Sequence, residues 1–453
     1  MLPAASPLLA DMAEGRTTAT RLVETALAHA TDPAGEGVRV FTALYADQAM
    51  AQAAAFDQAR AAGISLPPLA GLPVTIKDLF DEAGRETLAG SVASHGEGPA
   101  AQDAAAVAAL RRAGAIILGR TTMTEYAFSG LGLNPHTGTP RNPWDRANGR
   151  IPGGSSAGAA VSVSDGMAVA GLGSDTGGSL RIPAALCGLT GFKPTARRVS
   201  RDGAYPLSTS LDCIGVIARS VQCCALFDQI LSASPVPPLP PLSLQGRRLA
   251  IPTTVVLDQM DIHVAASFAA TVRTLEKAGA SIEEIALPEL AEIPARGIQG
   301  GIAAAEAYAL HQHRLVRRAQ LYDPRVLVRI LNGQAIPASI YIDCLKAREE
   351  ICTRISRITS AYDALIMPTV PTVAPLLAPL ECDDGLYGAT NALMLRNTSL
   401  FNALDRPAIS LPCHAPGTAP VGLMVVGETM KDDVTLSLAC AIETALQTAG
   451  TNA

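Results

Sequence analysis

Two serines lie inside glycine-rich stretches near the middle of the chain, and a lysine lies in an apolar segment upstream of both. The three segments are Leu72-Pro73-Val74-Thr75-Ile76-Lys77-Asp78, Gly153-Gly154-Ser155-Ser156-Ala157-Gly158 and Gly173-Ser174-Asp175-Thr176-Gly177-Gly178-Ser179-Leu180-Arg181. A serine hydroxyl is a weak nucleophile at neutral pH and needs a proton acceptor beside it. Glycines next to a serine let backbone N–H groups approach a reacting carbonyl. Together the segments indicate acyl transfer.

Ser179 is the candidate nucleophile. It precedes a predicted helix that begins near Leu180, and the preceding N–H groups could point at one spot and hold an oxyanion. This predicted oxyanion hole consists of Thr176, Gly177, Gly178 and Ser179. The alternative for this segment alone is a glycine turn in which Ser179 caps the helix.

Lys77 is the candidate base. It must be neutral at rest to accept a proton, which requires burial strong enough to lower its pKa by several units. Its apolar strand makes such burial plausible, although a lone lysine in a strand is more often a solvated edge residue. The neighbouring Asp78 would favour the charged form if it pointed the same way, and strand alternation predicts that it does not.

All three segments resemble the amidase signature family of Ser-Ser-Lys hydrolases. The resemblance is strongest from Leu72 to Thr195 and returns at 364–369 and 420–427. It implies a single α/β domain with a large mixed β-sheet flanked by helices. Within residues 1–453, it implies an N-terminal helical part at about 1–65, a catalytic core at 66–235, an α/β and helical region that shapes the pocket at 245–362, and a C-terminal return to the core sheet at 363–453.

The resemblance also implies roles for the serines and the lysine. Ser155 lies 24 positions before Ser179 (179 − 155), the family spacing between the bridging serine and the nucleophile. In family members a cis peptide bond, here Gly154–Ser155, precedes the bridging serine. Ser155 is therefore expected to pass a proton from Ser179 to Lys77. Ser156 is expected to cap the following helix.

Three further charged residues are candidates for the site. Asp175 and Arg181 flank the nucleophile, and we expect them to pair and brace its turn, although Arg181 could instead bind a substrate carboxylate. Arg348 occupies a place resembling the carboxylate-reading arginine of the A subunits of glutamine-using amidotransferases, which makes it a candidate for substrate binding.

The activity implied is hydrolysis of a small carboxamide to an acid and ammonia or an amine through an acyl-enzyme. One alternative is the glutamine-hydrolysing A subunit of a tRNA-dependent amidotransferase. Another, of a different class, is a non-catalytic structural subunit with the same fold.

The composition of the chain limits the classes of partner that it is expected to bind. The chain is 48% hydrophobic and 17% charged, and its net charge of −6 without a basic run gives no electrostatic footprint for nucleic acid. Its first residues do not resemble a secretory signal, and it has neither a run of about 18 apolar residues nor a Cys-x-x-Cys pair, so we expect a cytoplasmic protein with free thiols and no membrane partner. We expect no cofactor, because Gly-x-Gly-x-x-Gly is absent, and no metal. The sequence leaves open whether the chain forms a homodimer.

Helix and strand patterns alternate along the chain, as in α/β proteins. The patterns predict strands at 72–79, 115–118, 168–172, 248–252 and 281–286 and helices at 22–30, 157–167 and 264–278, with 303–362 mostly helical. Proline clusters at 235–241 and 368–379 mark loops, and the first is the best candidate linker.

Overall fold

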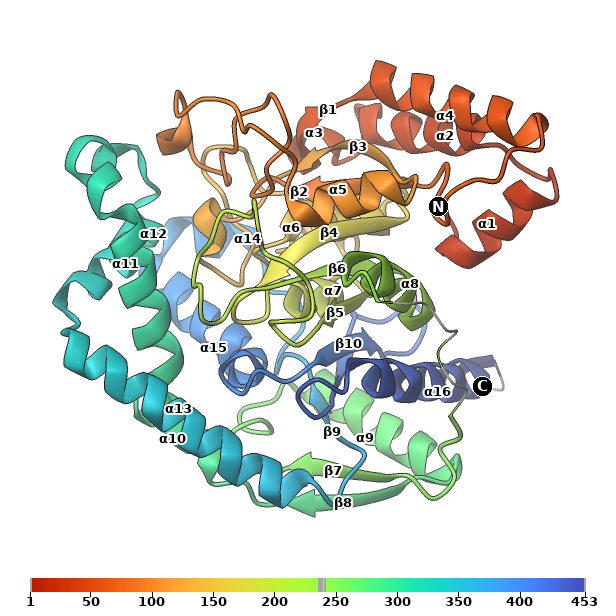
Figure 1. Ribbon diagram of the computed structural model, residues 1–453. Coiled ribbons are helices and arrows are strands. Elements are labelled where there is room, and N and C mark those ends of the chain that lie inside the picture. Colours follow the sequence, from red (N-terminus) through yellow and green to blue (C-terminus); the bar gives the residue numbers. More distant parts are fainter. Residues whose placement is uncertain (1, 235–238, 240–241, 452–453) are drawn as a thin grey trace.

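An 11-stranded mixed β-sheet forms the centre of the molecule (Figure 1). The computed structural model describes residues 2–234, 239 and 242–451. The strand order is β1-β3-β2-β4-β6-β5-β10-β11-β9-β7-β8. The strands are β1 (Phe41–Leu44), β2 (Pro73–Lys77), β3 (Ile116–Thr121), β4 (Ala170–Asp175), β5 (Thr190–Lys193), β6 (Cys213–Ala218), β7 (Arg248–Pro252), β8 (Ser281–Ile285), β9 (Ala364–Pro368), β10 (Ala408–Pro412) and β11 (Gly422–Val426).

The described α-helices flank this sheet. They are α1 (Ala5–Ala13), α2 (Ala19–Thr31), α3 (Gly37–Val40), α4 (Ala46–Ala61), α5 (Ala105–Arg112), α6 (Ala157–Ser164), α7 (Arg181–Leu186), α8 (Val221–Leu231), α9 (Ile262–Lys277), α10 (Glu289–Ala295), α11 (Ile298–Arg318), α12 (Pro324–Leu331), α13 (Ala338–Thr359), α14 (Leu377–Cys382), α15 (Asp384–Ala403) and α16 (Asp432–Thr451). None of the described helices is both long enough and apolar enough to cross a membrane.

Both faces of the central strands of the sheet are buried, as strand β6 shows. Ile217 packs with Ala184 of α7 on one face, whereas Val216 packs in the same cluster as Phe227 of α8 on the other. Because successive side chains of a strand point to opposite faces, a strand covered on both faces is buried along its length. The continuous burial of β2, β4 and β6 follows from this arrangement.

The predicted elements are present with shifted ends. The helix expected at 157–167 ends at Ser164, because Gly166 adopts a φ of 75° that no helix continues through. The strand expected at 168–172 instead spans Ala170–Asp175, since pairing with β6 extends it through Gly173 and Ser174. The linker predicted at 235–241 falls almost entirely outside the described residues.

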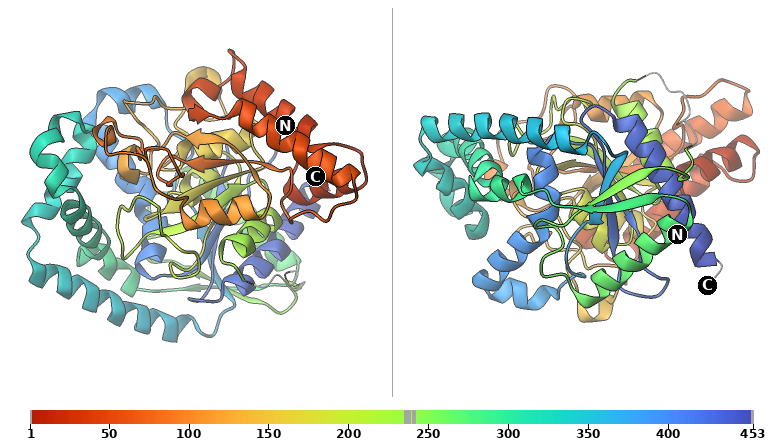
Figure 2. Two further views of the ribbon diagram at one scale, coloured as in Figure 1. Left: turned by 45° about the horizontal axis from the view of Figure 1, so that its top comes forward. Right: turned by 90° about the horizontal axis from the view of Figure 1, so that it is seen from below.

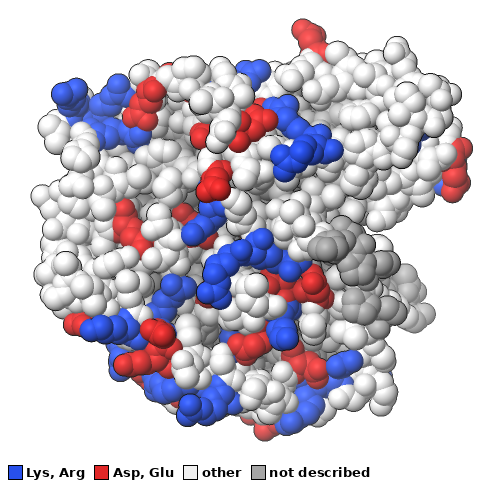
Figure 3. Space-filling model, in the orientation of Figure 1, with Lys and Arg blue, Asp and Glu red and all other residues white. Residues whose placement is uncertain are grey.

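Helices α11, α12 and α13 stand beside the sheet on the side away from α1, α2 and α4 (Figure 2). They belong to the stretch that the sequence predicts to be mostly helical. On the face seen in Figure 3, basic and acidic side chains are interspersed rather than gathered by sign. The helices α11 and α12, together with the turns after β4, surround the candidate site described next.

Candidate active site

The candidate catalytic residues converge where two parallel neighbouring strands end. Strand β2 pairs with β4 in parallel, so Lys77 and Asp175, the last residues of these strands, leave the sheet at the same edge. Ser155 lies just before α6, and the Gly154–Ser155 peptide bond is cis. Three segments far apart in the sequence thus meet at one place.

Lys77 is fully buried and contacts two serine hydroxyls. Its Nζ donates to Ser155 Oγ at 2.7 Å and to Ser174 Oγ at 2.9 Å. Burial lowers the pKa of Lys77 to about 7, although the negative charges of Asp175 and Asp212 act in the opposite direction. A substantial fraction of Lys77 is therefore neutral at neutral pH and able to accept a proton.

Asp78 points away from this cluster, as strand alternation predicts. Its carboxylate accepts hydrogen bonds from Thr42 Oγ1 at 3.1 Å and from the Gly90 N–H at 2.9 Å. It also pairs with Arg120, with Nε 3.2 Å from the carboxylate. The charge next to Lys77 in sequence is thus neutralised on the other side of the strand.

Ser179 lies in a buried turn directly beside the segment that carries Ser155. The Ser156 N–H donates to the Ser179 carbonyl at 3.3 Å, which ties the two serine turns together. The Ser179 side chain is almost completely buried, and among the described residues its hydroxyl makes no hydrogen bond. Its oxygen is therefore free to turn toward a reacting carbonyl or a proton acceptor.

Asp175 and Arg181 form a buried pair that braces the Ser179 turn. Arg181 donates to the Asp175 carboxylate through Nε at 3.1 Å and through Nη2 at 2.9 Å, and both side chains are fully inaccessible. Burial acts to raise the pKa of Asp175, but Arg181, Lys193 and Asn402 together outweigh it and lower that pKa to about 2. The same carboxylate accepts the N–H groups of Gly178 and Leu180. Because Arg181 is buried in this pair, it supports the turn rather than binding a substrate carboxylate.

The predicted oxyanion hole needs one correction. The Gly178 N–H donates to Asp175 Oδ1 at 2.8 Å, so it holds the turn and does not face the substrate. Within the described part of the chain, no hydrogen bond engages the N–H groups of Thr176, Gly177 or Ser179. These three donors stay available. Glycine spacing alone does not show which N–H groups of the turn the Asp175 carboxylate engages.

Arg348 is the clearest departure from expectation. It does not line the pocket that contains Ser179. Its Nε donates to the Ala403 carbonyl at 2.6 Å, and its Nη1 donates to the Ser210 carbonyl at 3.2 Å. Ala403 is the last residue of α15, where backbone carbonyls lack helical partners. Arg348 thus caps a helix end, and the prediction that it binds substrate is not met by its position.

Ser156 is the N-cap residue of α6, as predicted, but its hydroxyl does not accept from the helix. It instead donates to the Ser174 carbonyl at 3.3 Å. This contact joins the Ser155 segment to β4, so Ser156 helps to place the segment rather than to satisfy the helix terminus.

Helix α15 supplies support that the sequence did not reveal. Asn402 donates to the Asp175 backbone carbonyl at 3.0 Å and to its carboxylate at 2.9 Å. Thr398 donates to the Gly177 carbonyl at 2.6 Å. These partners are more than 200 residues away from the nucleophile turn, and no local pattern in α15 distinguishes them from ordinary polar residues.

Asp212 and Gln299 also approach the turn. The Thr176 hydroxyl donates to Asp212 Oδ1 at 2.5 Å, and burial raises the pKa of this carboxyl to about 6. Gln299 donates through Nε2 to the Thr176 carbonyl at 2.9 Å, which leaves its Oε1 buried without a hydrogen-bond partner among the described residues. A buried acceptor of this kind can be satisfied by an N–H group of a ligand.

A cavity of about 450 Å³ opens onto Ser179. This volume is in the range of small-molecule sites. Apolar side chains and chain turns from the nucleophile loop, α11, α12 and α15 line it: Ala127, Phe128, Ser129, Thr176, Gly177, Ser179, Leu207, Gln299, Gly300, Gly301, Ala303, Ala304, Arg329, Asn332, Ile336, Asn391, Leu395 and Ser399. The lining residues between 299 and 336 come from α11, α12 and the segment that follows α12.

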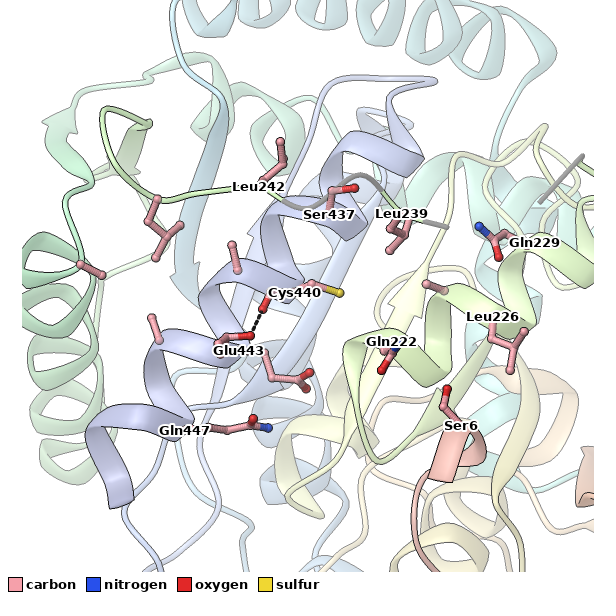
Figure 4. Close-up of a pocket in the computed structure, with 16 residues that line it drawn as sticks. Ser6, Gln222, Leu226, Gln229, Leu239, Leu242, Ser437, Cys440, Glu443 and Gln447 are labelled. Carbon is pink, nitrogen blue, oxygen red and sulfur yellow. Dashed lines mark hydrogen bonds between the residues drawn. The ribbon is translucent and has the colours of Figure 1, made fainter. Parts of the chain in front are cut away.

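The larger hollow in Figure 4, of about 820 Å³, lies elsewhere, between α8, α16 and the segment around Leu242. It contains none of the candidate catalytic residues. Among the described residues, no group of three or more His, Cys, Asp or Glu side chains is arranged to hold a metal ion.

Comparison with known proteins identifies the family and the fold. The family model described as Amidase matches residues 21–436. The chain is 36% identical over 401 residues to 2-amino-5-chloromuconic acid deaminase of Comamonas testosteroni, covering 87% of this chain and 86% of the relative. It is 35% identical over 444 residues to the A subunit of the glutamyl-tRNA(Gln) amidotransferase of Moorella thermoacetica, covering 90% and 89%. A solved structure of an amidase superposes with a TM-score of 0.88 at 32% identity, covering 98% and 99%.

The large mixed sheet and the match to the family model define the class of this protein as a hydrolase of carbon–nitrogen bonds. The chain belongs to the amidase signature family, and its activity is that of an amidase.

Proposed function

We propose that the protein hydrolyses a small carboxamide through an acyl-enzyme on Ser179, with Ser155 and Lys77 as the proton relay. The single observation that carries this proposal is the 2.7 Å contact between Lys77 Nζ and Ser155 Oγ, made by a fully buried lysine whose pKa burial lowers to about 7. A buried amine in hydrogen-bond contact with a hydroxyl, with a pKa near the working pH, is the arrangement that a general base requires.

In the first step Ser179 Oγ attacks the amide carbonyl. Its proton passes to Ser155 Oγ while the Ser155 proton passes to the neutral Nζ of Lys77. The charge that develops on the carbonyl oxygen is stabilised by the N–H groups of Thr176, Gly177 and Ser179. The proton then returns through Ser155 to the leaving nitrogen, and ammonia or an amine departs.

In the second step water attacks the acyl-enzyme on Ser179. The same relay removes a proton from the water and then returns one to the Ser179 oxygen, which releases the acid. Gln299 Oε1, the unpartnered buried acceptor among the residues that line the cavity, is suited to bind the N–H of the substrate amide. The cavity size favours a small acyl group.

The glutamine-hydrolysing A subunit of a tRNA-dependent amidotransferase is the second candidate function, favoured by the relative from Moorella thermoacetica. Such a protein would pass ammonia to a partner chain. The placement of Arg348 weighs against it, because the arginine expected to hold the glutamine carboxylate caps α15 instead. Dependence of turnover on a co-purified partner chain would distinguish the two.

The direct test is ammonia release from a panel of small amides that includes malonamate-like, ureido, aryl and amino-acid amides and glutamine. Release by the native protein that disappears in Ser179→Ala supports the proposal. Ser156→Ala is the matched control, since Ser156 is buried beside the site but contacts only the Ser174 carbonyl through its hydroxyl. Equal ammonia release by the native protein and Ser179→Ala would refute the assigned nucleophile.

A further inference from the structure

The cavity that opens onto Ser179 has an uneven charge. Among its lining residues, Arg329 on α12 is the one charged side chain, and the others are apolar, glycine, hydroxyl or carboxamide residues. No acidic side chain of the described residues forms an ion pair with Arg329. The pocket therefore presents a single uncompensated positive charge to whatever binds in it.

Two contacts hold the Arg329 side chain in place, but they do not use all of its hydrogen-bond donors. Its Nη1 donates to the Phe128 carbonyl at 2.6 Å, and its guanidinium lies 5.3 Å from the ring centre of Tyr387. An arginine carries five N–H donors, so most of its donors stay free among the described residues. The hydrogen bond and the ring contact restrict the Arg329 side chain, which lowers the entropic cost of ordering it around a planar partner.

Arg329 lies at the mouth of the Ser179 cavity. Besides the Ser179 cavity, it lines a shallow surface depression together with Arg325 and Asp384. Arg325, on the same helix, differs from Arg329 both in its ion pair and in its relation to the cavity. It pairs with Asp384 at 2.6 Å, and it does not line the Ser179 cavity. Two arginines four residues apart on one helix thus have different partners, and only Arg329 lacks an acidic one.

We propose that the substrate is an amide that also carries a carboxylate, and that Arg329 binds this carboxylate at the mouth of the cavity. The inference rests on the proposed function and deepens it. One planar cation without an anion partner matches one planar carboxylate, to which a guanidinium can donate two parallel hydrogen bonds. The apolar side chains of Leu207, Ile336 and Leu395 would cover the carbon chain that joins the carboxylate to the amide.

The test compares pairs of amides that differ only in the carboxylate. Malonamate, succinamate and glutaramate are each assayed beside the neutral alkyl amide with the same number of carbons: propionamide, butyramide and valeramide. We expect the native protein to prefer one of the acids. In Arg329→Met, kcat/KM for that acid should fall about 10- to 100-fold, whereas the neutral amides should change by less than about threefold.

Two further variants separate recognition from structure. Arg325→Met should behave as the native protein, since its side chain stacks on the same Tyr387 ring but does not reach the cavity. Arg329→Lys keeps the charge and should recover part of the preference for the acid. Equal losses on acid and neutral amides in Arg329→Met, or a native protein without any preference, would overturn the inference.

Calorimetric binding of malonate, succinate and glutarate to Ser179→Ala gives a readout that does not need turnover. Binding that weakens at least 10-fold when Arg329→Met is added supports the inference even if no amide is hydrolysed, in which case the proposed function fails alone. Turnover of neutral amides with no dicarboxylate binding would overturn the inference and leave the proposed function standing.

Discussion

The nucleophile turn and the helical wall that faces it differ in how their polar groups are satisfied. In the turn, the Asp175 carboxylate accepts hydrogen bonds from Arg181, Asn402 and two backbone N–H groups, all of them buried. In the wall, Gln299 Oε1 has no partner among the described residues, and Arg329 uses one donor on a protein group. Groups that position the chemistry are saturated by the protein, whereas groups that we assign to recognition keep hydrogen-bonding capacity for a ligand.

The largest effect is expected from removing the nucleophile. Ser179→Ala should lower kcat by at least about 10³-fold, because the proposed bond-forming oxygen is gone while the buried turn stays intact. Ser156→Ala should lower it by less than about 10-fold. Steady-state ammonia release with the best amide of the panel measures both. Comparable losses in the two variants would show that the turn was disturbed as a whole.

In the nucleophile turn, removal of one member of the buried ion pair should cause a large loss of stability. Arg181→Met leaves the Asp175 charge buried without its cation, so the free energy of unfolding should fall by about 3–5 kcal/mol. Arg296→Met removes a half-exposed pair with Glu292 and should cost less than about 1 kcal/mol. Urea denaturation followed by circular dichroism measures the difference. Similar losses in both variants would contradict the structural role of the buried pair.

In the helical wall, removal of the unpartnered Gln299 acceptor should affect substrate binding more than folding. Gln299→Leu removes the acceptor that we assign to the substrate N–H, and kcat/KM should fall about 10-fold. Both Gln299→Leu and Gln299→Glu lose the donor to the Thr176 carbonyl, but only Gln299→Glu keeps an acceptor, so it should retain more of the activity. A Gln299→Leu variant that is less stable but equally active would reverse this assignment.

The smallest expected effect is a shift in pH dependence. Activity should rise with pH through about 7 as Lys77 loses its proton. The negative charge of Asp212 raises the pKa of Lys77, so Asp212→Asn should move the rise to lower pH. Profiles of kcat/KM from pH 5 to 9 measure the shift. A rise that moves to higher pH would show that Asp212 does not act on Lys77 through its charge.

Local sequence predicted the parts of the site that neighbouring residues determine. Glycine spacing and strand pattern indicated Lys77 at a strand end, Ser155 before a helix and Ser179 after a strand, and the Asp175–Arg181 pair lies within one turn. These features depend on residues close together in the chain, where periodicity and turn chemistry are informative.

The remaining parts depend on packing between distant elements. Asn402 and Gln299 reach the nucleophile turn from α15 and α11, and a single polar residue on an amphipathic helix carries no sign of its partner. For the same reason Arg348 and Arg329 could not be ranked from sequence. Both are helical arginines, and only the fold shows that the first meets carbonyls at a helix end and the second meets a cavity.

Covalent labelling of Ser179 by a fluorophosphonate probe, followed at pH 5 to 9 and located by peptide mass spectrometry, tests the central claim most directly. The relay predicts modification at Ser179 alone, with a rate that rises through an apparent pKa of about 7 and is almost abolished in Lys77→Met. Modification at another residue, or a rate at Ser179 that does not depend on pH and survives the loss of Lys77, would contradict it.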